Sequence, residues 1–537
     1  MSGFRPHTAW AGGLVAAAAL AAAALAATAV SAAPATAVSA APATAVSGPR
    51  ADVATAAALA QLDIGSQIND KRGCSAVLVA PQWLLTAASC FTDTPGGSLA
   101  PGAPKLKTAA TIGGTAQQVV NLVPRAGRDV VMAQLAKPVG GITPLPVADS
   151  APAVGDEAQV AGYGRTREEW IPDQVHAATF TVRNLSATTV DLAAKSDNAA
   201  VCQGDTGGPA LGTVSGRTAV VAVNSRSWQG GCLGGDPAET RTGAVAARVE
   251  NVAGWVRQVV YGTTFANAPW KHAVQMTAGH YTGDAAGTRR MDLIVVWDDG
   301  EVTLYQGGDG TDPAHPFSAE YRLQPAKSIW AKALAVTSVN TGGGTDGLVV
   351  RWIDGEMSLY STVDAKGFHG EKQLAPPKSA TWKADARLLV GGRFTAGGRR
   401  DGLLADWKDG HVSVFGDVAA DGLKKQTQTA AKNNTWTYAG HLTTGSFTGK
   451  STDDLLVRWV DGESTVYPGV TAKALPGEVK IRPAKANWRD ATVVAVGAFL
   501  GDSAADVLVR WSDGHVSLFP GVDAKGLHAE VRLAPAG

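Results

Sequence analysis

Residues 506–519 read DVLVRWSDGHVSLF and contain the pattern on which the C-terminal half of the chain is built. Residues 506–511 are almost continuously apolar, as expected of a strand near the middle of a sheet. The Asp-Gly pair at 513–514 tolerates the positive φ of a tight two-residue turn. Residues 516–519 then alternate apolar and polar side chains, as a returning strand does. The stretch therefore predicts a β-hairpin.

This hairpin is one of five copies. The tetrapeptide Trp-x-Asp-Gly begins at residues spaced 55, 55, 52 and 52 apart, namely Trp297, Trp352, Trp407, Trp459 and Trp511. A second tryptophan series has nearly the same period: Trp270, Trp330, Trp382, Trp436 and Trp488. In the last copy, residues 491–499 and 530–533 supply two further strands. Four short strands in a repeat of about 50 residues are typical of a propeller blade. The sequence predicts a five-bladed β-propeller over residues 270–537, and closing the ring hides its sheet edges.

The loop before the central strand of each copy resembles that of bacterial FG-GAP (VCBS-like) repeats, whose consensus is Gly-Asp-Phe-Asn-Gly-Asp-Gly-x-x-Asp-Leu. Residues 497–506 (GAFLGDSAAD) and 445–453 (GSFTGKSTD) carry the resemblance. In that family the loop aspartates can bind calcium through oxygen ligands. Here most of the early carboxylates are missing. We therefore expect no metal or other cofactor, and expect the remaining aspartates to cap turns, with calcium as the alternative: Asp292, Asp346, Asp401 and Asp506.

The ten periodic tryptophans have two possible roles. Packing inside the blades is the expected one. The alternative is a set of exposed platforms on which sugars stack, because tryptophan offers a flat apolar face and one N–H donor.

The first segment of the chain is typical of a secretory signal peptide. Arg5 and His7 precede an apolar run over residues 14–27, and small residues follow at 30–32. A membrane anchor is the alternative, but this run is shorter than the roughly 20 residues that a span needs. We predict a signal peptide over residues 1–32 and a low-complexity Ala/Pro leader over 33–58, where the octet SAAPATAV occurs twice. The mature protein is then secreted and has no membrane span.

The composition excludes one class of partner. Lysine plus arginine total 47, and aspartate plus glutamate total 47. A net charge of zero gives no electrostatic footprint for nucleic acid. Hydrophobic residues at 45% and charged residues at 18% are typical of folded domains. Nothing in the sequence sets an oligomeric state. The four cysteines allow three disulfide pairings, and an exported chain can oxidise them.

The N-terminal half resembles the trypsin-like (chymotrypsin, S1) peptidases. Residues 73–91, GCSAVLVAPQWLLTAASCF, are similar to the segment that carries the catalytic histidine of that family. Residues 129–135, DVVMAQL, are similar to the segment of the triad aspartate, and residues 202–209, CQGDTGGP, to the nucleophile loop. The resemblance implies a double β-barrel over about residues 59–262 and a C-terminal helix near 252–260, with a linker over 263–269. It also implies disulfides Cys74–Cys90 and Cys202–Cys232.

Two of the three implied triad positions hold other residues. The triad needs a hydroxyl nucleophile, an imidazole that accepts its proton and a carboxylate that orients the imidazole. The implied histidine position is Ser89, whose hydroxyl is not basic near neutral pH, and the implied serine position is Thr206. Asp129 alone is retained. His176 is the only histidine of the mature trypsin-like domain, and we do not expect it to act as the base.

Other parts of the implied site are kept in part. The backbone amides of Gly204 and Thr206 are expected to form an anion-binding hollow, as the oxyanion hole does in active relatives. The residues at the implied base of the specificity pocket are Ala200 and Val201, so an acidic base is missing. Asp205, which pairs with a freshly cut N-terminus in animal relatives, has no evident partner in the sequence.

Two functions remain open at this point. The first is a secreted pseudoprotease with a propeller recognition module, which binds an extracellular protein or glycan without cleaving it. The second is an active secreted endopeptidase that uses Thr206 as its nucleophile through an unforeseen base and is targeted by its propeller.

Overall fold

The computed structural model of the chain describes residues 53–537 apart from 68, 95, 283–289, 343, 397, 420–421 and 502–504. The predicted signal peptide, residues 33–52 of the predicted leader and three residues of the last FG-GAP-like loop (502–504) lie outside the described part. The last six residues of the predicted leader form a short helix, α1 (Val53–Ala58).

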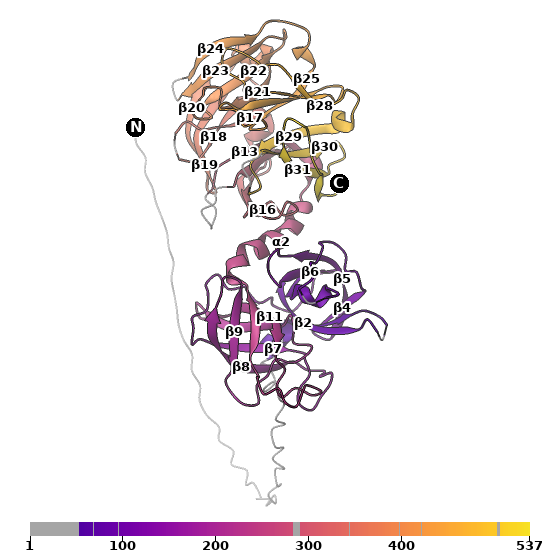
Figure 1. Cartoon of the computed structure of the whole chain (residues 1–537). Coiled ribbons are helices and arrows are strands. Elements are labelled where there is room, and N and C mark those ends of the chain that lie inside the picture. Colours follow the sequence, from indigo (N-terminus) through magenta and orange to yellow (C-terminus); the bar gives the residue numbers. More distant parts are fainter. Residues whose placement is uncertain are drawn as a thin grey trace, which may run out of the picture. The chain divides into compact units, whose positions relative to one another are not determined.

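Two closed six-stranded barrels make up the N-terminal domain (Figure 1). The first has the strand order β1-β2-β3-β6-β5-β4 and the second β10-β11-β12-β9-β8-β7. The strands of the first barrel are β1 (Leu59–Ile64), β2 (Arg72–Ala80), β3 (Trp83–Thr86), β4 (Thr108–Ile112), β5 (Thr115–Pro124) and β6 (Val131–Leu135). Those of the second are β7 (Glu157–Gly162), β8 (His176–Leu185), β9 (Thr189–Ala194), β10 (Pro209–Val214), β11 (Arg217–Ser227) and β12 (Ala244–Arg248). The predicted double barrel is confirmed.

Each barrel closes around its own apolar core. In the first barrel, buried and half-buried residues alternate along β4 and β3 is fully buried, so side chains such as Leu84 and Ile112 point inward. In the second, Phe180 and Leu192 occupy the corresponding interior. Such alternation is what a sheet with one solvated face requires, so the sequence pattern accounts for the cores.

Helix α2 (Ala253–Ala266) follows the second barrel. Trp255 and Val259 pack into the core of the first barrel. The predicted C-terminal helix is therefore present, and it continues through the first four residues of the segment expected to be a linker. Phe265, near its end, is buried against Trp270, with ring centroids 4.6 Å apart.

Five four-stranded sheets follow, each made of consecutive strands (Figure 1). The first three blades are β13 (Ala273–Gly279), β14 (Asp292–Trp297), β15 (Val302–Gly307), β16 (Phe317–Gln324); β17 (Ala333–Val339), β18 (Gly347–Trp352), β19 (Met357–Asp364), β20 (Gly367–Ala375); and β21 (Ala386–Gly392), β22 (Gly402–Trp407), β23 (Val412–Ala419), β24 (Gly422–Ala430). The last two are β25 (Ala439–Gly445), β26 (Asp454–Trp459), β27 (Ser464–Tyr467), β28 (Val479–Arg482); and β29 (Ala491–Gly497), β30 (Ala505–Trp511), β31 (Val516–Val522), β32 (Val531–Ala534). The predicted five-bladed propeller is confirmed.

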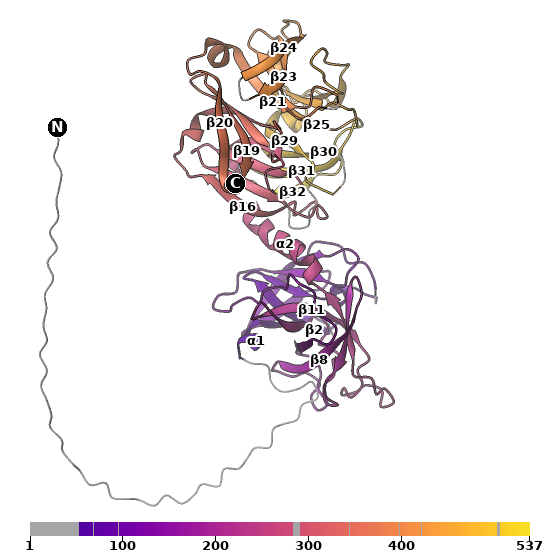
Figure 2. The ribbon, with the colours of Figure 1, turned by 90° about the vertical axis from the view of Figure 1, so that its left-hand side faces the viewer.

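The first strands of the blades meet at the centre of the propeller, where β13, β17, β21, β25 and β29 each pack against the next. Figure 2 labels three of them, β21, β25 and β29. Blade 5 closes the ring against blade 1. The Arg510 guanidinium of β30 donates to the Lys271 carbonyl (3.2 Å) and, through Nε, to that of Ala273 (3.1 Å). The backbone N–H of Met291 donates to Ala498 across the same junction (3.0 Å).

The two tryptophan series pair inside the blades. In each blade the two indole rings lie 5.2–5.8 Å apart between centroids. All ten are at most 8% exposed. They fill the blade cores as predicted, so their faces are not available as platforms for sugars.

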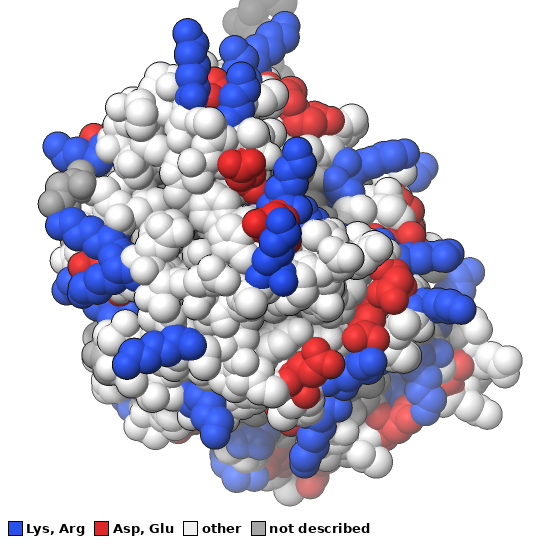
Figure 3. Space-filling model, turned by 90° about the horizontal axis from the view of Figure 1, so that it is seen from above, with Lys and Arg blue, Asp and Glu red and all other residues white. Residues whose placement is uncertain are grey.

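Charged side chains of both signs are interspersed on the face of the molecule shown in Figure 3, around a broad uncharged area. This distribution matches the net charge of zero. Among the described residues, no helix is long and apolar enough to cross a bilayer.

Candidate functional site

Ser89 and Asp129 are brought together by the pairing of strands β3 and β6, in which Thr86 lies opposite Val131. Ser89 lies in a single 3₁₀ turn (Ala88–Phe91) just after β3, and Asp129 just before β6. The Ser89 amide donates to Asp129 Oδ1 (2.7 Å) and the Ser89 hydroxyl to Oδ2 (2.9 Å). The position at which the family resemblance implies an imidazole therefore holds a hydroxyl that is bonded to the retained carboxylate.

Ser225, on β11, is a third group at Asp129. Its hydroxyl donates to Asp129 Oδ2 at 2.6 Å. The carboxylate thus accepts one amide and two hydroxyl hydrogen bonds, which is ample stabilisation for a half-buried anion without any cation. The sequence analysis missed Ser225 because residues 224–228, NSRSW, match none of the motifs it used.

Thr206 lies in the loop that leads into β10. Its carbonyl accepts a hydrogen bond from the Ser75 amide of the first barrel (2.9 Å). Within the described part of the chain, the Thr206 hydroxyl has no hydrogen-bond partner. The structure brings Ser89 and Asp129 into direct contact, whereas Thr206 is held by its carbonyl, which accepts from Ser75 and lies 3.7 Å from Cys90 Sγ.

The amides of the same loop divide into two groups. Those of Asp205, Gly207 and Gly208 donate to the carbonyls of Cys202, Asn224 and Asp205. Those of Gly204 and Thr206 have no acceptor among the described residues. Gly204 has φ +103° and Gly207 φ +86°, and a Cβ on Gly207 would lie 2.0 Å from the Thr86 hydroxyl. This left-handed backbone favours glycine and leaves two free N–H groups, as an anion-binding hollow requires.

Asp205 is buried, and its carboxylate is bound by backbone instead of a cation. Oδ1 accepts from the Gly164 amide (2.7 Å) and Oδ2 from the Cys202 amide (2.9 Å). A Cβ on Gly162 or Gly164 would approach the carboxyl group to 2.3 Å, so these glycines let the loop after β7 wrap around it. Burial raises the pKa of Asp205 to about 6, and the two amides offset only part of that shift.

The implied specificity pocket has an apolar base. Ala200 is buried beside the disulfide Cys202–Cys232. The Ser227 hydroxyl donates to the Val201 carbonyl at 2.5 Å, which ties β11 to the segment that forms this base. Both disulfides implied by the resemblance, Cys74–Cys90 and Cys202–Cys232, are present.

His176 belongs to the second barrel. It is the first residue of β8, where it pairs with Gly162 of β7. The three hydrogen bonds on Asp129 come from Ser89 and Ser225, so the structure does not assemble His176, Asp129 and Thr206 into a triad.

Three of the four predicted propeller aspartates accept hydrogen bonds from backbone amides. Asp346 accepts from the His280 amide at 2.8 Å, whereas within the described part of the chain the Asp401 carboxylate has only the Arg399 guanidinium, 4.0 Å away. Asp292 accepts backbone hydrogen bonds from Tyr281 (2.9 Å), Thr282 (2.6 Å) and Gly307 (2.8 Å). Asp506 accepts from the amides of Phe499, Leu500 and Gly521 at 2.9–3.0 Å. Their carboxylate oxygens are thus taken by backbone N–H groups. Among the described residues, no three or more His, Cys, Asp or Glu side chains gather as a metal site would need.

Comparisons with known proteins concern the N-terminal half of the chain. Residues 46–256 match the Trypsin family model. The N-terminal half contains a trypsin-like domain. Similar curated proteins are the platelet-aggregating proteinase PA-BJ of Bothrops jararaca, 25% identical over 36% of this chain and 87% of the relative, and the snake venom serine protease Haly-2 of Gloydius brevicauda, 26% identical over 37% and 82%. A solved structure of neuropsin, a serine protease expressed in the limbic system of mouse brain, is 19% identical over 39% of this chain and 98% of its own, with a TM-score of 0.31.

Proposed function

We propose that this protein is a secreted trypsin-fold pseudoprotease whose propeller is a recognition module, and that it binds an extracellular protein or glycan without cleaving it. The observation that carries the proposal is the environment of Asp129, which accepts hydrogen bonds from two serine hydroxyls and an amide. A serine hydroxyl does not accept a proton near neutral pH. Loss of the triad histidine alone costs about 10⁶ in kcat in subtilisin.

The trypsin-like domain is suited to holding a segment of polypeptide. The free amides of Gly204 and Thr206 offer two donors to a carbonyl or carboxylate oxygen. The apolar base at Ala200, with Ser227 bonded across it, favours a small apolar side chain over lysine or arginine. The domain would therefore bind its partner through these two amides and this apolar base, and it would leave the partner uncleaved.

Secretion is supported by three features: the apolar N-terminal run, the two disulfides and the venom origin of similar proteases. We propose cleavage of a signal peptide near residue 32. The assignment of the blades to the FG-GAP type rests on the loop sequences, and it involves no calcium because aspartates such as Asp292 and Asp506 already accept backbone amides.

Active proteolysis is the second candidate, and one observation favours it. The Thr206 hydroxyl is unbonded within the described residues and lies in the same loop as the two free amides, so nucleophile and hollow are both present. This candidate requires a base that accepts the proton of Thr206.

Incubation of the mature chain with a fluorescently labelled protein substrate and a fluorophosphonate probe separates the two. We expect no cleavage and no labelling. Cleavage or labelling that disappears in Thr206→Ala would overturn the pseudoprotease proposal. As a positive test of the scaffold, Ser89→His combined with Thr206→Ser should produce measurable proteolysis, because an imidazole at residue 89 would stand next to Asp129 and the Ser225 hydroxyl.

A further inference from the structure

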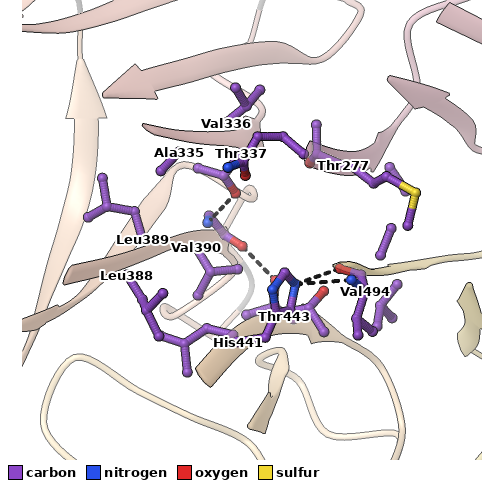
Figure 4. Close-up of a pocket in the computed structure, with 18 of the residues that line it drawn as sticks. Thr277, Ala335, Val336, Thr337, Leu388, Leu389, Val390, His441, Thr443 and Val494 are labelled. Atoms are coloured by element: carbon purple, nitrogen blue, oxygen red, sulfur yellow. Dashed lines mark hydrogen bonds between the residues drawn. The ribbon is translucent and has the colours of Figure 1, made fainter. Parts of the chain in front are cut away.

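The centre of the propeller contains a cavity of about 230 Å³ that is lined by the first strand of every blade (Figure 4). Since a water molecule occupies about 30 Å³ in the liquid, the cavity has room for roughly seven waters or for one molecule about as large as a monosaccharide. It is open to solvent at one end, where Val274 and Leu334 line it and remain 39% and 40% exposed.

Three threonines occupy the same position in the first strands of their blades and line the cavity (Figure 4). Two of them join neighbouring blades: Thr277 Oγ1 accepts from the Ser338 amide (3.0 Å), and Thr337 Oγ1 accepts from the Gly391 amide (2.7 Å). Each of these hydroxyls still has its proton to donate. The third, Thr443 on β25, has no hydrogen-bond partner among the described residues, although the residue is only 8% exposed. Its hydroxyl lines the cavity and is free both to donate and to accept, so Thr443 can bind a molecule held there.

His441 supplies an acceptor beside Thr443. Its Nε2 is 2.7 Å from the Val494 carbonyl and 3.3 Å from the Val494 amide nitrogen. The shorter contact assigns the ring proton to Nε2, which leaves Nδ1 as an acceptor. Burial lowers the pKa of His441 to about 4, so the ring is neutral near pH 7.

The two cationic side chains that line the cavity are already neutralised. Arg387 donates to Asp406 Oδ2 (2.7 Å) and to the carbonyls of Trp436 and Ala439. Arg400 Nε lies 3.3 Å from Asp453 Oδ2. The cavity therefore offers hydroxyl donors and a neutral acceptor between apolar side chains such as Val336 and Leu389, and it presents no unpaired charge to a ligand.

We infer that the central cavity of the propeller binds a small neutral polyhydroxylated molecule, the size of one sugar residue, through Thr443, His441 and Thr337. Hydroxyls that both donate and accept match this set, and the C–H faces of such a ligand match Val336 and Leu389. The inference deepens the proposed recognition role of the propeller, on which it rests, and gives that role a place and a ligand class.

Saturation-transfer-difference NMR on the full mature chain tests the inference. The probes are glucose, N-acetylglucosamine, mannose and myo-inositol, and a β-linked N-acetylglucosamine tetramer as a chain-end probe. We expect saturation of at least one probe, with affinity falling about tenfold in Thr443→Val, since one ligand hydrogen bond is lost while the shape is kept. If the cavity binds free sugars, all the protons of a monosaccharide probe receive saturation. If it binds the end of a sugar chain, only the terminal residue of the tetramer does.

Two further variants make the result decisive. His441→Leu removes the acceptor and should also weaken binding about tenfold. Thr435 is exposed on the same blade and lies outside the cavity, so Thr435→Val should leave the binding affinity unchanged. Absence of saturation by every probe, or binding that Thr443→Val and His441→Leu leave intact, would overturn the inference. The proteolysis assay tests the barrel domain and is independent of the NMR experiment. Cleavage would overturn only the pseudoprotease proposal, and absence of saturation would overturn only the proposed sugar binding in the cavity.

Discussion

The barrel domain and the propeller both repeat a small antiparallel sheet, but they place their buried polar groups in opposite ways. In the barrel domain two carboxylates collect them: Asp129 accepts three hydrogen bonds from Ser89 and Ser225, and Asp205 accepts two backbone amides. The propeller distributes them. In four blades the indole N–H of the Trp-x-Asp-Gly tryptophan donates to a hydroxyl six residues on, at 2.9–3.1 Å, and that hydroxyl donates to a glutamate.

The difference shows where each domain is sensitive to change. A substitution at the barrel site alters a unique arrangement that nothing else duplicates. A substitution in a blade alters one of five near-equivalent units, whose stability adds through contacts with neighbouring units. In the pseudoprotease that we propose, Ser89 and Thr206 remove the chemistry of the triad while the barrel fold persists.

The largest expected effect lies in a blade core. Trp488 is 1% exposed and packs on Trp511 and Phe519. Trp488→Ala should lower the free energy of unfolding of the propeller by about 3–5 kcal/mol, measured by urea titration, and should leave the barrel domain unchanged. Trp228→Ala, at a residue 42% exposed, is the matched control and should have little effect. Equal effects of the two variants would contradict the packing assigned to the buried tryptophans.

The next largest expected effect is a pH dependence in the stability of the barrel domain. Because burial raises the pKa of Asp205 from 3.8 to about 6, the folded state retains the proton more tightly than the unfolded chain. Stability from this group is complete below pH 4 and is lost as the pH rises through 6. The loss is about 3 kcal/mol at most. Thermal melts from pH 3.5 to 7 should show this slope, and Asp205→Asn should flatten it, whereas the exposed Asp197→Asn should keep it. An unchanged slope in Asp205→Asn would assign the dependence to other groups.

A smaller effect is expected at Asp129. Ser225→Ala removes one of three hydrogen bonds to the carboxylate and should destabilise the barrel domain by about 1 kcal/mol. In a double-mutant cycle with Ser89→Ala, the two losses should couple, because both hydroxyls donate to Oδ2. Unfolding in urea measures both, with the exposed Ser150→Ala as the control. Strict additivity would show that the hydroxyls act independently.

The smallest effect lies in blade 3, the exception among the blades. Trp407 Nε1 has no hydrogen-bond partner within the described residues, and Ser413 instead accepts from Gln426 (3.5 Å). Gln426 occupies the register position of Glu530, which accepts from Ser517 in blade 5. Gln426→Glu should let Ser413 donate to a carboxylate and accept from Trp407, and so stabilise the propeller by up to about 1 kcal/mol. Gln118→Glu, at an exposed residue of the barrel domain far from Ser413 in the chain, is the control and should not. A destabilised Gln426→Glu variant would contradict this account.

The sequence alone could predict the parts of this molecule that depend on local sequence patterns. The Asp-Gly turns, the alternating strands and the paired tryptophans repeat often enough to define the blades, and the family resemblance implied Asp129 and both disulfides. The sequence could not predict hydrogen bonds between residues that only the folded chain brings together. The Ser225 bond to Asp129 and the Gly164 bond to Asp205 join segments 96 and 41 residues apart. Thr443 also has the same residue type and strand position as Thr277 and Thr337, and only the assembled ring shows that its hydroxyl is left without a partner.

The closure of the ring has a topological consequence. Every blade is built from four consecutive strands, so blades 5 and 1 share no sheet. Their junction, at Arg510 and Ala273, is a seam held by side-chain and loop contacts, like the other four junctions. A circular permutant that joins residue 537 to 270 through a short linker and opens between blades 2 and 3 should therefore rebuild the same ring, with the chain break moved to a different junction.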